Sequence, residues 1–245
     1  MANNNEHIIE VEHLTKKFGS FKANDDLTFF VKKGEIFGFL GANGAGKTTA
    51  IKILCGLWKP TEGNIHVAGY DVYTQHNKIK RNIGYMSQKF SLYEDMTIRE
   101  NFRFYGGIYG LKNKEIEDRT GYFIEKLALQ EYEDKVVKSL PLGWKQKIAF
   151  SVAIMHEPRI VFLDEPTSGV DPVTRRQFWD MIYETAGSGI TVFMTTHYMD
   201  EAEYCQRVSI MVDGRIEALD TPEKLKEMFG CTSMEEVFIK IARGR

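Results

Sequence analysis

The residues whose spacing most strongly indicates chemistry form the segment GANGAGKTT, from Gly41 to Thr49. The segment fits the pattern G-x-x-x-x-G-K-[ST], in which glycines let backbone N–H groups turn inward around phosphates. In such a loop Lys47 is placed to reach the β- and γ-phosphates of a nucleotide, and the Thr48 hydroxyl is placed to bind Mg²⁺. The predicted nucleotide-binding residues are Gly41, Ala42, Asn43, Gly44, Ala45, Gly46, Lys47, Thr48 and Thr49.

A second segment, IVFLDEP, places two adjacent carboxylates after a run of apolar residues. This pattern is typical of a buried strand that ends at Asp164, at the edge of the sheet where nucleotides bind in such folds. We expect Asp164 to hold Mg²⁺ through water, and Glu165 to orient or deprotonate an attacking water. A solvated strand end would explain the segment taken alone, but the phosphate-loop pattern upstream favours the catalytic interpretation.

These two segments need a scaffold, and strands alternate with helices along most of the chain. GEIFGFLG predicts a buried strand before the phosphate loop, and KTTAIKILCGL predicts a helix after it. RIVFLDE and GITVFMTTH predict strands, PVTRRQFWDMIYETA and YMDEAEYC predict helices, and RVSIMVDGRIEAL predicts two strands around an Asp-Gly turn. The alternation favours an α/β fold, a P-loop NTPase core with a mostly parallel sheet and helices on both faces.

Three regions add to this core. IIEVEHL, LTFFV and GNIHVAGYDV predict strands, for which we expect an N-terminal antiparallel β subdomain. Between about residues 89 and 150 the periodicity is helical, which predicts an inserted α-helical subdomain. Residues from about 222 to 245 predict a short C-terminal tail of two helices. We therefore expect residues 1–245 to form a single domain with these parts.

Four motifs carry a resemblance to a known family. LDEPTSGVDP, from Leu163 to Pro172, resembles the Walker B motif and D-loop of ATP-binding cassette (ABC) transporter ATPases. MTTH at 194–197 is similar to their switch-histidine segment, and MSQ at 86–88 is similar to their Q-loop. Phe18 lies upstream of the phosphate loop, where the family places an aromatic residue that stacks on adenine. The resemblance covers essentially the whole chain, with the motifs in the family's order.

The resemblance implies a role for each matching residue. Phe18 would stack on the base through its ring face, although the family usually has tyrosine there. Gln88 would contact Mg²⁺ or the attacking water, and His197 would contact the γ-phosphate and hold the water and Glu165 in line. Asp171 would cross to a second subunit and help to arrange its site. ATP and Mg²⁺ are the implied cofactors, and ATP hydrolysis is the implied reaction.

One stretch, SLPLGWKQK, departs from the family's signature loop L-S-G-G-Q. Leu140, Pro141, Leu142, Gly143 and Trp144 occupy the signature positions, and a basic run and an apolar helix follow them. The resemblance implies that this loop faces the γ-phosphate held by the opposite subunit. Pro141 offers neither a hydroxyl nor an N–H group. We therefore expect fewer contacts to phosphate, made through the backbone and the positive end of the helix.

The resemblance also implies partners. ATPases of this family act as dimers beneath a membrane subunit, so a second ATPase subunit and an integral-membrane partner are expected. This would place the protein in the cytoplasm, peripheral on the inner face of the cell membrane. LGWKQK, EPTSGVDPVTRR and SMEEVFIKI are similar to the type-2 export class, which drives efflux of drugs, lipids or polymers. Phe90, Leu92 and Tyr93 are candidates for contact with a coupling helix of the membrane subunit.

Composition and charge narrow the alternatives. The net charge of -2 gives no global basic field, so we expect no nucleic-acid partner. The three cysteines are far apart, which argues against a disulfide framework and suits a reducing cytosol. No window of the sequence approaches the apolar length of a membrane span, and the N-terminus lacks the pattern of a secretory signal. We therefore expect another chain to supply the membrane part.

Three functions follow from these observations. The first is the ATP-hydrolysing subunit of a membrane exporter. The second is a soluble ABC ATPase that acts on ribosomes or DNA, although such proteins usually carry two cassettes or a long coiled-coil insertion, and neither is present in this sequence. The third is a regulatory or scaffold protein that binds ATP and hardly cleaves it, an interpretation that the presence of both Glu165 and His197 disfavours.

Overall fold

Two β-sheets form the framework, and the computed structural model describes the chain over residues 6–88 and 92–243. The first sheet is antiparallel, with strand order β2-β1-β4-β5. The second has the order β10-β9-β3-β8-β7-β6 and is parallel except for the antiparallel pairing of β10 with β9. The strands are β1 (His7–Phe18), β2 (Phe21–Lys32), β3 (Ile36–Gly41), β4 (Glu62–Val67), β5 (Tyr70–Asp71), β6 (Ile83–Met86), β7 (Ile160–Asp164), β8 (Thr191–Thr196), β9 (Arg207–Val212) and β10 (Arg215–Asp220).

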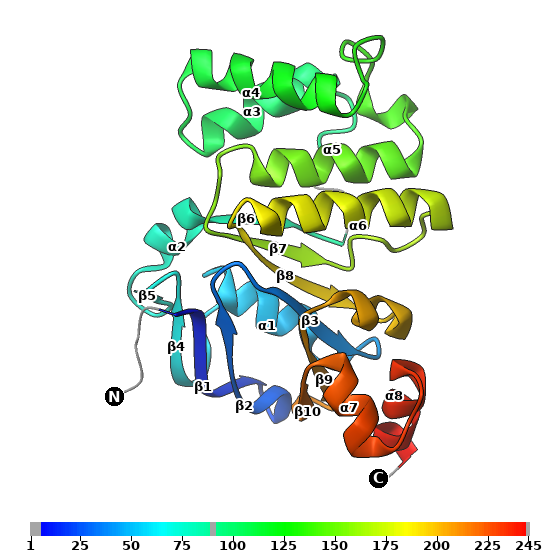
Figure 1. Cartoon of the computed structure of the whole chain (residues 1–245). Helices are drawn as coiled ribbons and strands as arrows, with labels where there is room; N and C mark the ends of the chain where they lie inside the picture. Colours follow the sequence, from blue (N-terminus) through cyan, green and yellow to red (C-terminus); the bar gives the residue numbers. More distant parts are fainter. Residues whose placement is uncertain (1–5, 89–91, 244–245) are drawn as a thin grey trace.

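Helices surround the parallel sheet in layers. Helix α1 lies between the two sheets, whereas α5 and α6 cover the opposite side of the parallel sheet and α3 and α4 lie beyond them (Figure 1). Helices α7 and α8 pack together beside the β9–β10 edge (Figure 1). The helices are α1 (Lys47–Leu54), α2 (His76–Asn82), α3 (Ile98–Ile108), α4 (Asn113–Lys126), α5 (Leu142–Ile154), α6 (Pro172–Gly187), α7 (Pro222–Phe229) and α8 (Met234–Arg243), with 3₁₀ helices η1 (Val137–Ser139) and η2 (Met199–Tyr204).

The central strands are buried on both faces and are rich in apolar residues, apart from the threonines of β8 and the terminal Asp164 of β7. Every residue of β3, β7 and β8 is buried, as expected for parallel strands covered on both sides. One apolar cluster fills the space between the two sheets around α1, and includes Phe37, Phe39 and Phe193. A second cluster lies beneath α5 and α6 and continues into the helical layer. The predicted α/β core with an antiparallel N-terminal sheet is therefore confirmed.

Parallel register brings the predicted chemical segments to one edge of the sheet. Strand β7 pairs with β8 so that Asp164 lies opposite Thr195, and β8 pairs with β3 so that Thr196 lies opposite Leu40. The carboxyl ends of β3, β7 and β8 are therefore adjacent. The phosphate loop follows β3, the two carboxylates lie at the end of β7, and His197 follows β8. All three therefore lie at the edge of the sheet where α/β folds bind their ligands.

The helical layer begins with a well-defined cap. Thr97 accepts a hydrogen bond from the backbone N–H of Glu100, and the Glu100 carboxylate accepts one from the N–H of Thr97, which satisfies two donors that a helix start leaves unpaired. On the buried side of α3, Phe102 stacks on Phe123 of α4 with ring centroids 5.8 Å apart. Capping and apolar packing together explain why the predicted helical segment folds as helices.

Three details differ from the sequence-based expectations. The segment YMDEAEYC forms the 3₁₀ helix η2, because its backbone makes tighter bonds such as that from the N–H of Glu201 to the carbonyl oxygen of Tyr198, 3.2 Å apart. Helix α2 was not expected. Leu92 is buried in the apolar core, which makes it unsuitable as a contact for a partner, whereas Tyr93 is exposed. Phe90 lies outside the described residues.

Candidate nucleotide-binding and catalytic site

The loop between β3 and α1 takes its shape at Gly46, the residue before α1. Gly46 has a φ of 101°, and a Cβ added there would lie 2.1 Å from the carbonyl oxygen of Ala23. The Asn24 side-chain amide donates to the carbonyl oxygen of Gly46 over 3.1 Å. Only glycine fits a left-handed backbone pressed this closely against β2. The phosphate loop is therefore fixed in place by its own backbone and by the neighbouring sheet.

Lys47 follows as the first residue of α1, and only 4% of it is exposed. Its Nζ donates to the carbonyl oxygens of Gly41 at 2.7 Å and Ala42 at 3.1 Å, and lies 3.4 Å from Oε1 of Glu165. Burial lowers the pKa of Lys47, whereas the charges of Glu165 and Asp164 act in the opposite direction. The ammonium group is therefore held between the phosphate loop and the carboxylates at the end of β7.

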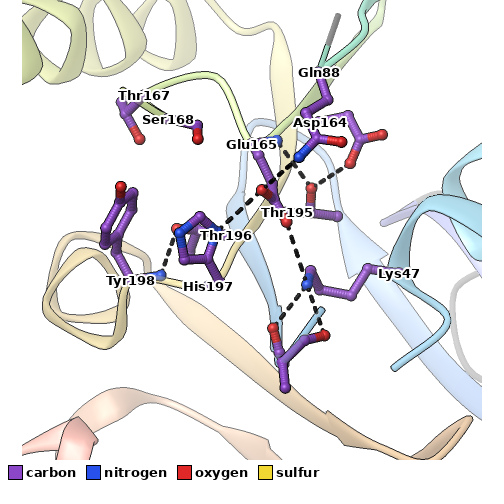
Figure 2. A network of polar contacts seen from close by, with 12 residues as sticks. Lys47, Gln88, Asp164, Glu165, Thr167, Ser168, Thr195, Thr196, His197 and Tyr198 are labelled. Carbon is purple, nitrogen blue, oxygen red and sulfur yellow. Dashed lines mark hydrogen bonds and ion pairs between the residues drawn. The ribbon is translucent and has the colours of Figure 1, made fainter. Parts of the chain in front are cut away.

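Glu165, directly after β7, lies at the centre of the polar network in Figure 2. Its φ of 51° is in the left-handed region, which is uncommon for a residue other than glycine, and its N–H donates to the Thr195 hydroxyl over 3.0 Å. The Gln88 side-chain amide donates to Oε2 of Glu165 over 2.9 Å, and Nδ1 of His197 lies 3.0 Å from the same oxygen. The structure thus brings together Gln88, Glu165 and His197 beside Lys47.

Asp164 is the last residue of β7 and is almost fully buried. Its Oδ1 accepts hydrogen bonds from the hydroxyls of Thr195 at 2.7 Å and Thr48 at 3.4 Å. Burial raises the pKa of Asp164, while the two hydroxyls and the charge of Lys47 favour its ionised form. Thr48 and Asp164, which the sequence predicted as metal-binding residues, therefore lie in direct contact.

The donor set around Asp164 suits Mg²⁺. The Thr48 hydroxyl, the Asp164 carboxylate and the Gln88 amide all offer oxygen atoms, the ligands that this hard cation prefers. Within residues 6–88 and 92–243, no cluster of three or more His, Cys, Asp or Glu could hold a metal ion. Mg²⁺ in nucleotide sites takes one or two protein groups and is otherwise bound by phosphates and water. A small oxygen set beside a phosphate loop therefore fits Mg²⁺ bound together with a nucleotide.

A cavity of about 290 Å³ lies beside the phosphate loop, and an aromatic ring forms part of its wall. That ring belongs to Phe21, which is 63% exposed. Phe18, the predicted base-stacking residue, is also exposed, pairs with Phe21 across the β1–β2 hairpin and lies edge-on to Trp58 with ring centroids 5.5 Å apart. The cavity is lined by Phe21, Ala23, Asn43, Gly44, Gly46, Lys47, Thr48, Thr49, Gln88 and Glu165.

Helix α5 begins within the segment Leu140–Trp144, whereas the sequence analysis placed the helix after this segment. Helix α5 begins at Leu142, with Pro141 as its N-cap and without a side-chain hydrogen bond to the cap. The carbonyl oxygen of Pro141 accepts hydrogen bonds from the N–H groups of Trp144 and Lys145, each over 3.1 Å. Proline suits this place because its ring fixes φ and its missing N–H is not needed there. Leu142, Gly143 and Trp144 thus form the first turn of α5, and Leu140 is buried.

Gly143 and Asp171 both contact Thr174 in α6, the first by packing and the second by hydrogen bonds. A Cβ added at Gly143 would lie 2.5 Å from Cγ2 of Thr174, so a glycine is needed for α5 and α6 to pack this closely. Asp171 caps α6 by accepting from the N–H groups of Val173 and Thr174, each over 3.0 Å, and from the Thr174 hydroxyl over 2.6 Å. The hydroxyl of Thr174 is the main cause of a lowered pKa at Asp171.

The start of α5 also borders Gln88 and Glu165 of its own chain, two of the predicted catalytic residues. A second cavity, of about 230 Å³, is lined by Leu142 and Gln146 on one side and by Gln88 and Glu165 on the other. Gln146 is buried, and its amide donates to the carbonyl oxygen of Ser168 over 3.2 Å. The sequence did not predict this proximity, because it depends on how α5 packs over the end of β7.

Comparison with known proteins identifies the family. Residues 24–168 match the family model described as ABC transporter. The chain belongs to the ABC transporter family. The probable multidrug ABC transporter ATP-binding protein YbhF of Escherichia coli (strain K12) is 46% identical over 241 residues, which cover 96% of this chain and 42% of that protein. The linearmycin resistance ATP-binding protein LnrL of Bacillus subtilis (strain 168) is 35% identical over 224 residues, which cover 91% of this chain and 72% of that protein.

A solved structure supports the same assignment to the ABC family. The structure described as the ATP binding subunit of an ABC transporter superposes with a TM-score of 0.87 at 29% sequence identity, covering 96% of this chain and 99% of that chain. This ABC chain spans less than half the length of YbhF. Its core is therefore that of an ABC ATPase domain, built on a P-loop NTPase fold.

Two residues of this ABC site were missed in the sequence. Thr195 bonds both Asp164 and the backbone of Glu165, and the only signal for it was its place in TTH, two residues before His197. Phe21 lines the cavity beside the phosphate loop, and its signal was an aromatic residue close to Phe18. In both cases a pairing between strands places the side chain, which a motif cannot reveal.

Proposed function

We propose that this chain binds ATP together with Mg²⁺, hydrolyses it, and thereby powers export through a separate membrane subunit. The observation that carries the proposal is the shared contact at Oε2 of Glu165, which lies 2.9 Å from the Gln88 amide and 3.0 Å from Nδ1 of His197. A carboxylate held from two sides beside a phosphate loop is suited to receive a proton from water or to orient it. A protein that only binds ATP would not need this arrangement.

Different residues of this chain would have different roles in hydrolysis. The phosphate loop from Gly41 to Thr49 would bind the phosphates, and Lys47 would offset the charge on the β- and γ-phosphates. Glu165 would align the attacking water, with Gln88 and His197 holding the carboxylate in place. Thr48, Asp164 and the Gln88 amide oxygen would hold Mg²⁺, which when bound offsets negative charge on the phosphate oxygens. Catalysis of this kind rests on positioning and electrostatics.

We propose a dimer of two such subunits with ATP bound at the interface. The segment Leu140–Trp144 and Asp171 would face the nucleotide held by the second subunit, and Phe18 or Phe21 would stack on its own adenine. The joint packing of Gly143 and Asp171 on Thr174 supports the idea that these two segments move as one unit. Binding of ATP would close the dimer, and hydrolysis would allow it to open.

The membrane subunit is proposed to dock on the side of the helical layer near α2 and β6. A groove of about 410 Å³ there is lined by apolar and cationic side chains, with Leu57 and Ile108 exposed at its rim. Tyr93 adds an exposed ring that packs edge-on against Phe104 with centroids 4.7 Å apart. An apolar groove of this kind suits an amphipathic helix. None of the helices within residues 6–88 and 92–243 combines the length and the apolar character of a membrane span. We propose that binding to the membrane subunit places the chain at the inner face of the cell membrane.

The cargo class is proposed from the relatives. YbhF is described as a probable multidrug transporter component and LnrL as a linearmycin resistance protein. Both names concern resistance to or transport of drugs, which supports a drug-like cargo for the transporter to which this chain would belong. Contacts to such a cargo would lie in the membrane subunit.

The experiment is steady-state phosphate release by the purified chain with Mg²⁺ and ATP. Glu165→Gln should lower kcat about 10²- to 10⁴-fold, the usual contribution of a general base, and should leave ATP binding intact. The exposed Glu131→Gln is the matched control and should keep full activity. If the wild-type chain releases no phosphate that depends on Glu165, the catalytic part of the proposal is wrong. Loss of the chain from washed membranes on deletion of an adjacent membrane-protein gene would test the transport part.

A further inference from the structure

A fully buried carboxylate, Glu201, lies close behind the catalytic residues. It is 0% exposed and belongs to η2, the 3₁₀ helix that follows His197. Burial of a carboxylate is costly unless hydrogen bonds or an opposite charge compensate for lost water. The Thr167 hydroxyl donates to Oε1 of Glu201 over 2.6 Å, and Nε of Arg175 lies 3.7 Å from the same oxygen. Within the described residues, Oε2 of Glu201 has no hydrogen-bond partner.

The two partners of Glu201 come from the segment that carries the proposed catalytic and interface residues. Thr167 is buried and lies in the loop between Glu165 and Asp171. Arg175 lies in the first turn of α6, and its backbone N–H donates to the carbonyl oxygen of Asp171 over 2.9 Å. Both contacts therefore act on the stretch from Glu165 to the start of α6.

Arg175 also contacts the other side of the site. Its guanidinium lies 4.4 Å from the ring centre of Tyr198, the residue after His197, and 3.5 Å from a carboxylate oxygen of Asp200. The His197 segment and the Glu165 segment are therefore connected behind the catalytic face as well as through the contact between Glu165 and His197. Neither Glu201 nor Thr167 lines the cavity beside the phosphate loop.

We propose that Glu201 is a positioning residue for ATP hydrolysis, which ties the loop from Glu165 to Asp171 to the segment that follows His197. The inference rests on the proposed function, because it assigns Glu201 an effect on the step that Glu165 performs. Burial raises the pKa of Glu201, and the hydroxyls of Thr167 and Thr196 and the charge of Arg175 oppose that shift. Of these compensating groups, Thr167 lies in the loop after Glu165, Arg175 lies in α6 just beyond that loop, and Thr196 ends β8 directly before His197.

The contact between Glu201 and Thr167 should affect the chemical step more than nucleotide binding. Lys47 and the loop around it, where the phosphates are proposed to bind, are held by contacts to the carbonyl oxygens of Gly41 and Ala42 that do not involve Glu201. The orientation of Glu165 depends on the backbone that leads to Thr167. Small misplacements of a reacting group have large effects on rate, and a loss of this kind appears in kcat with KM unchanged.

The test compares Thr167→Val, which has nearly the same shape and lacks the hydroxyl, with Thr167→Ser, which keeps it. Thr185→Val is the matched control, because it removes another buried threonine hydroxyl, one near the C-terminal end of α6 that donates to the carbonyl oxygen of Met181 over 2.8 Å. Thr167→Val should lower kcat at least about tenfold with the KM for ATP within about twofold of wild type. Thr167→Ser and Thr185→Val should both stay within about twofold in kcat.

Two further measurements assign the effect to Glu201 and separate it from the proposed function. Glu201→Gln should lower kcat, and the double variant with Thr167→Val should lose little more than the worse single variant, since both substitutions act on one contact. Hydrogen exchange of the backbone amides from 165 to 171 should be faster in Thr167→Val than in Thr185→Val, with or without ATP turnover.

Each outcome bears on the inference. Equal kcat values for Thr167→Val and Thr185→Val, equal losses in Thr167→Val and Thr167→Ser, or a loss confined to KM would each overturn it. So would unchanged exchange at residues 165–171, which can be measured even in a chain without activity. By contrast, absence of Glu165-dependent hydrolysis in the wild-type chain would overturn the proposed function, and the exchange comparison would still decide whether Glu201 holds the loop.

Discussion

His197 lies with its Nδ1 3.0 Å from Oε2 of Glu165, although the two residues are 32 positions apart in the sequence. They meet because each follows the carboxyl end of one of two paired parallel strands, β7 and β8. The register of this pair fixes the contact, and the Thr195 hydroxyl strengthens it by bonding the N–H of Glu165 over 3.0 Å. Glu165 and His197 are thus positioned by the fully buried strands β7 and β8.

Substitutions of His197 should therefore depend on which nitrogen they imitate. In His197→Asn the amide nitrogen can take the place of Nδ1 and still bond Glu165, whereas His197→Ala removes both ring nitrogens. If orientation of Glu165 is a main role, His197→Asn should retain about tenfold more kcat than His197→Ala, equivalent to about 1.4 kcal/mol or one hydrogen bond. Phosphate release at saturating ATP measures this difference. Equal activity of the two variants would contradict the positioning role.

Two glycines of the phosphate loop should respond differently to alanine. Gly46 has a Cβ position only 2.1 Å from the carbonyl oxygen of Ala23, whereas a Cβ at Gly44 would meet nothing within 4 Å. Both have positive φ, so each alanine is strained, by about 1–2 kcal/mol, and only Gly46→Ala also clashes with backbone. Equilibrium binding of ATP should weaken about tenfold in Gly44→Ala and more than 100-fold in Gly46→Ala. A comparable loss in both variants would mean that strain alone governs the loop.

The phosphate loop and the carboxylates at the end of β7 were predictable because the residues that form each of them are consecutive in the sequence. A glycine-rich turn between a strand and a helix, or two acids after an apolar strand, is a local pattern with a local physical cause. The α/β fold was predictable for a similar reason, since buried parallel strands are rich in apolar residues. Gln88 and His197 were predicted as site residues from the resemblance of their segments to family motifs. In the structure both side chains contact Glu165.

Contacts that depend on tertiary packing were not predictable. Thr195 reaches Asp164 only through the register of β7 and β8, and Phe21 faces the cavity only because of the β1–β2 hairpin. Leu92 looked like an exposed contact residue, yet it packs in the core beneath the helical layer. Glu201 lay within a predicted α-helix, and its burial against Thr167 follows from the fold of η2. None of these positions carries a sequence pattern of its own.

Stability should fall as pH decreases because of His156. Its Nε2 lies 3.1 Å from the carbonyl oxygen of Ile83 and its ring stacks on Tyr109, with centroids 3.7 Å apart. Burial lowers the pKa of His156 from 6.5 to about 4. Between these values the unfolded chain binds a proton that the folded chain does not, so the free energy of unfolding decreases on acidification.

The expected loss at His156 is about 2 kcal/mol between pH 7 and pH 5, from 1.36 kcal/mol for each pKa unit. Urea unfolding at the two pH values measures it. His156→Gln removes the titrating group and should show a smaller decrease than wild type, even if it is less stable at pH 7. His66→Gln, on β4, is the control and should keep the wild-type decrease. An identical decrease in wild type and His156→Gln would rule out this source.

The segment Leu140–Trp144 leads to a prediction about dimer closure. Pro141, the N-cap of α5, has no N–H and no side chain that can donate, and Leu142 covers part of the helix start. Changing both residues to serine and glycine would add a hydroxyl and expose the backbone N–H groups of the first turn to a phosphate on the facing subunit.

In the Glu165→Gln background, where ATP should not be consumed, the variant Pro141→Ser with Leu142→Gly should form the proposed ATP-bound dimer more tightly. One added hydrogen bond to a charged group contributes about 1.5–3 kcal/mol, which corresponds to a gain of at least about tenfold in the dimerisation constant. Sedimentation with and without ATP measures the constant, and Met228→Ser, at an exposed position of α7, is the control. A constant that does not change would show that the contacts missing at Pro141 and Leu142 do not limit closure of the proposed dimer.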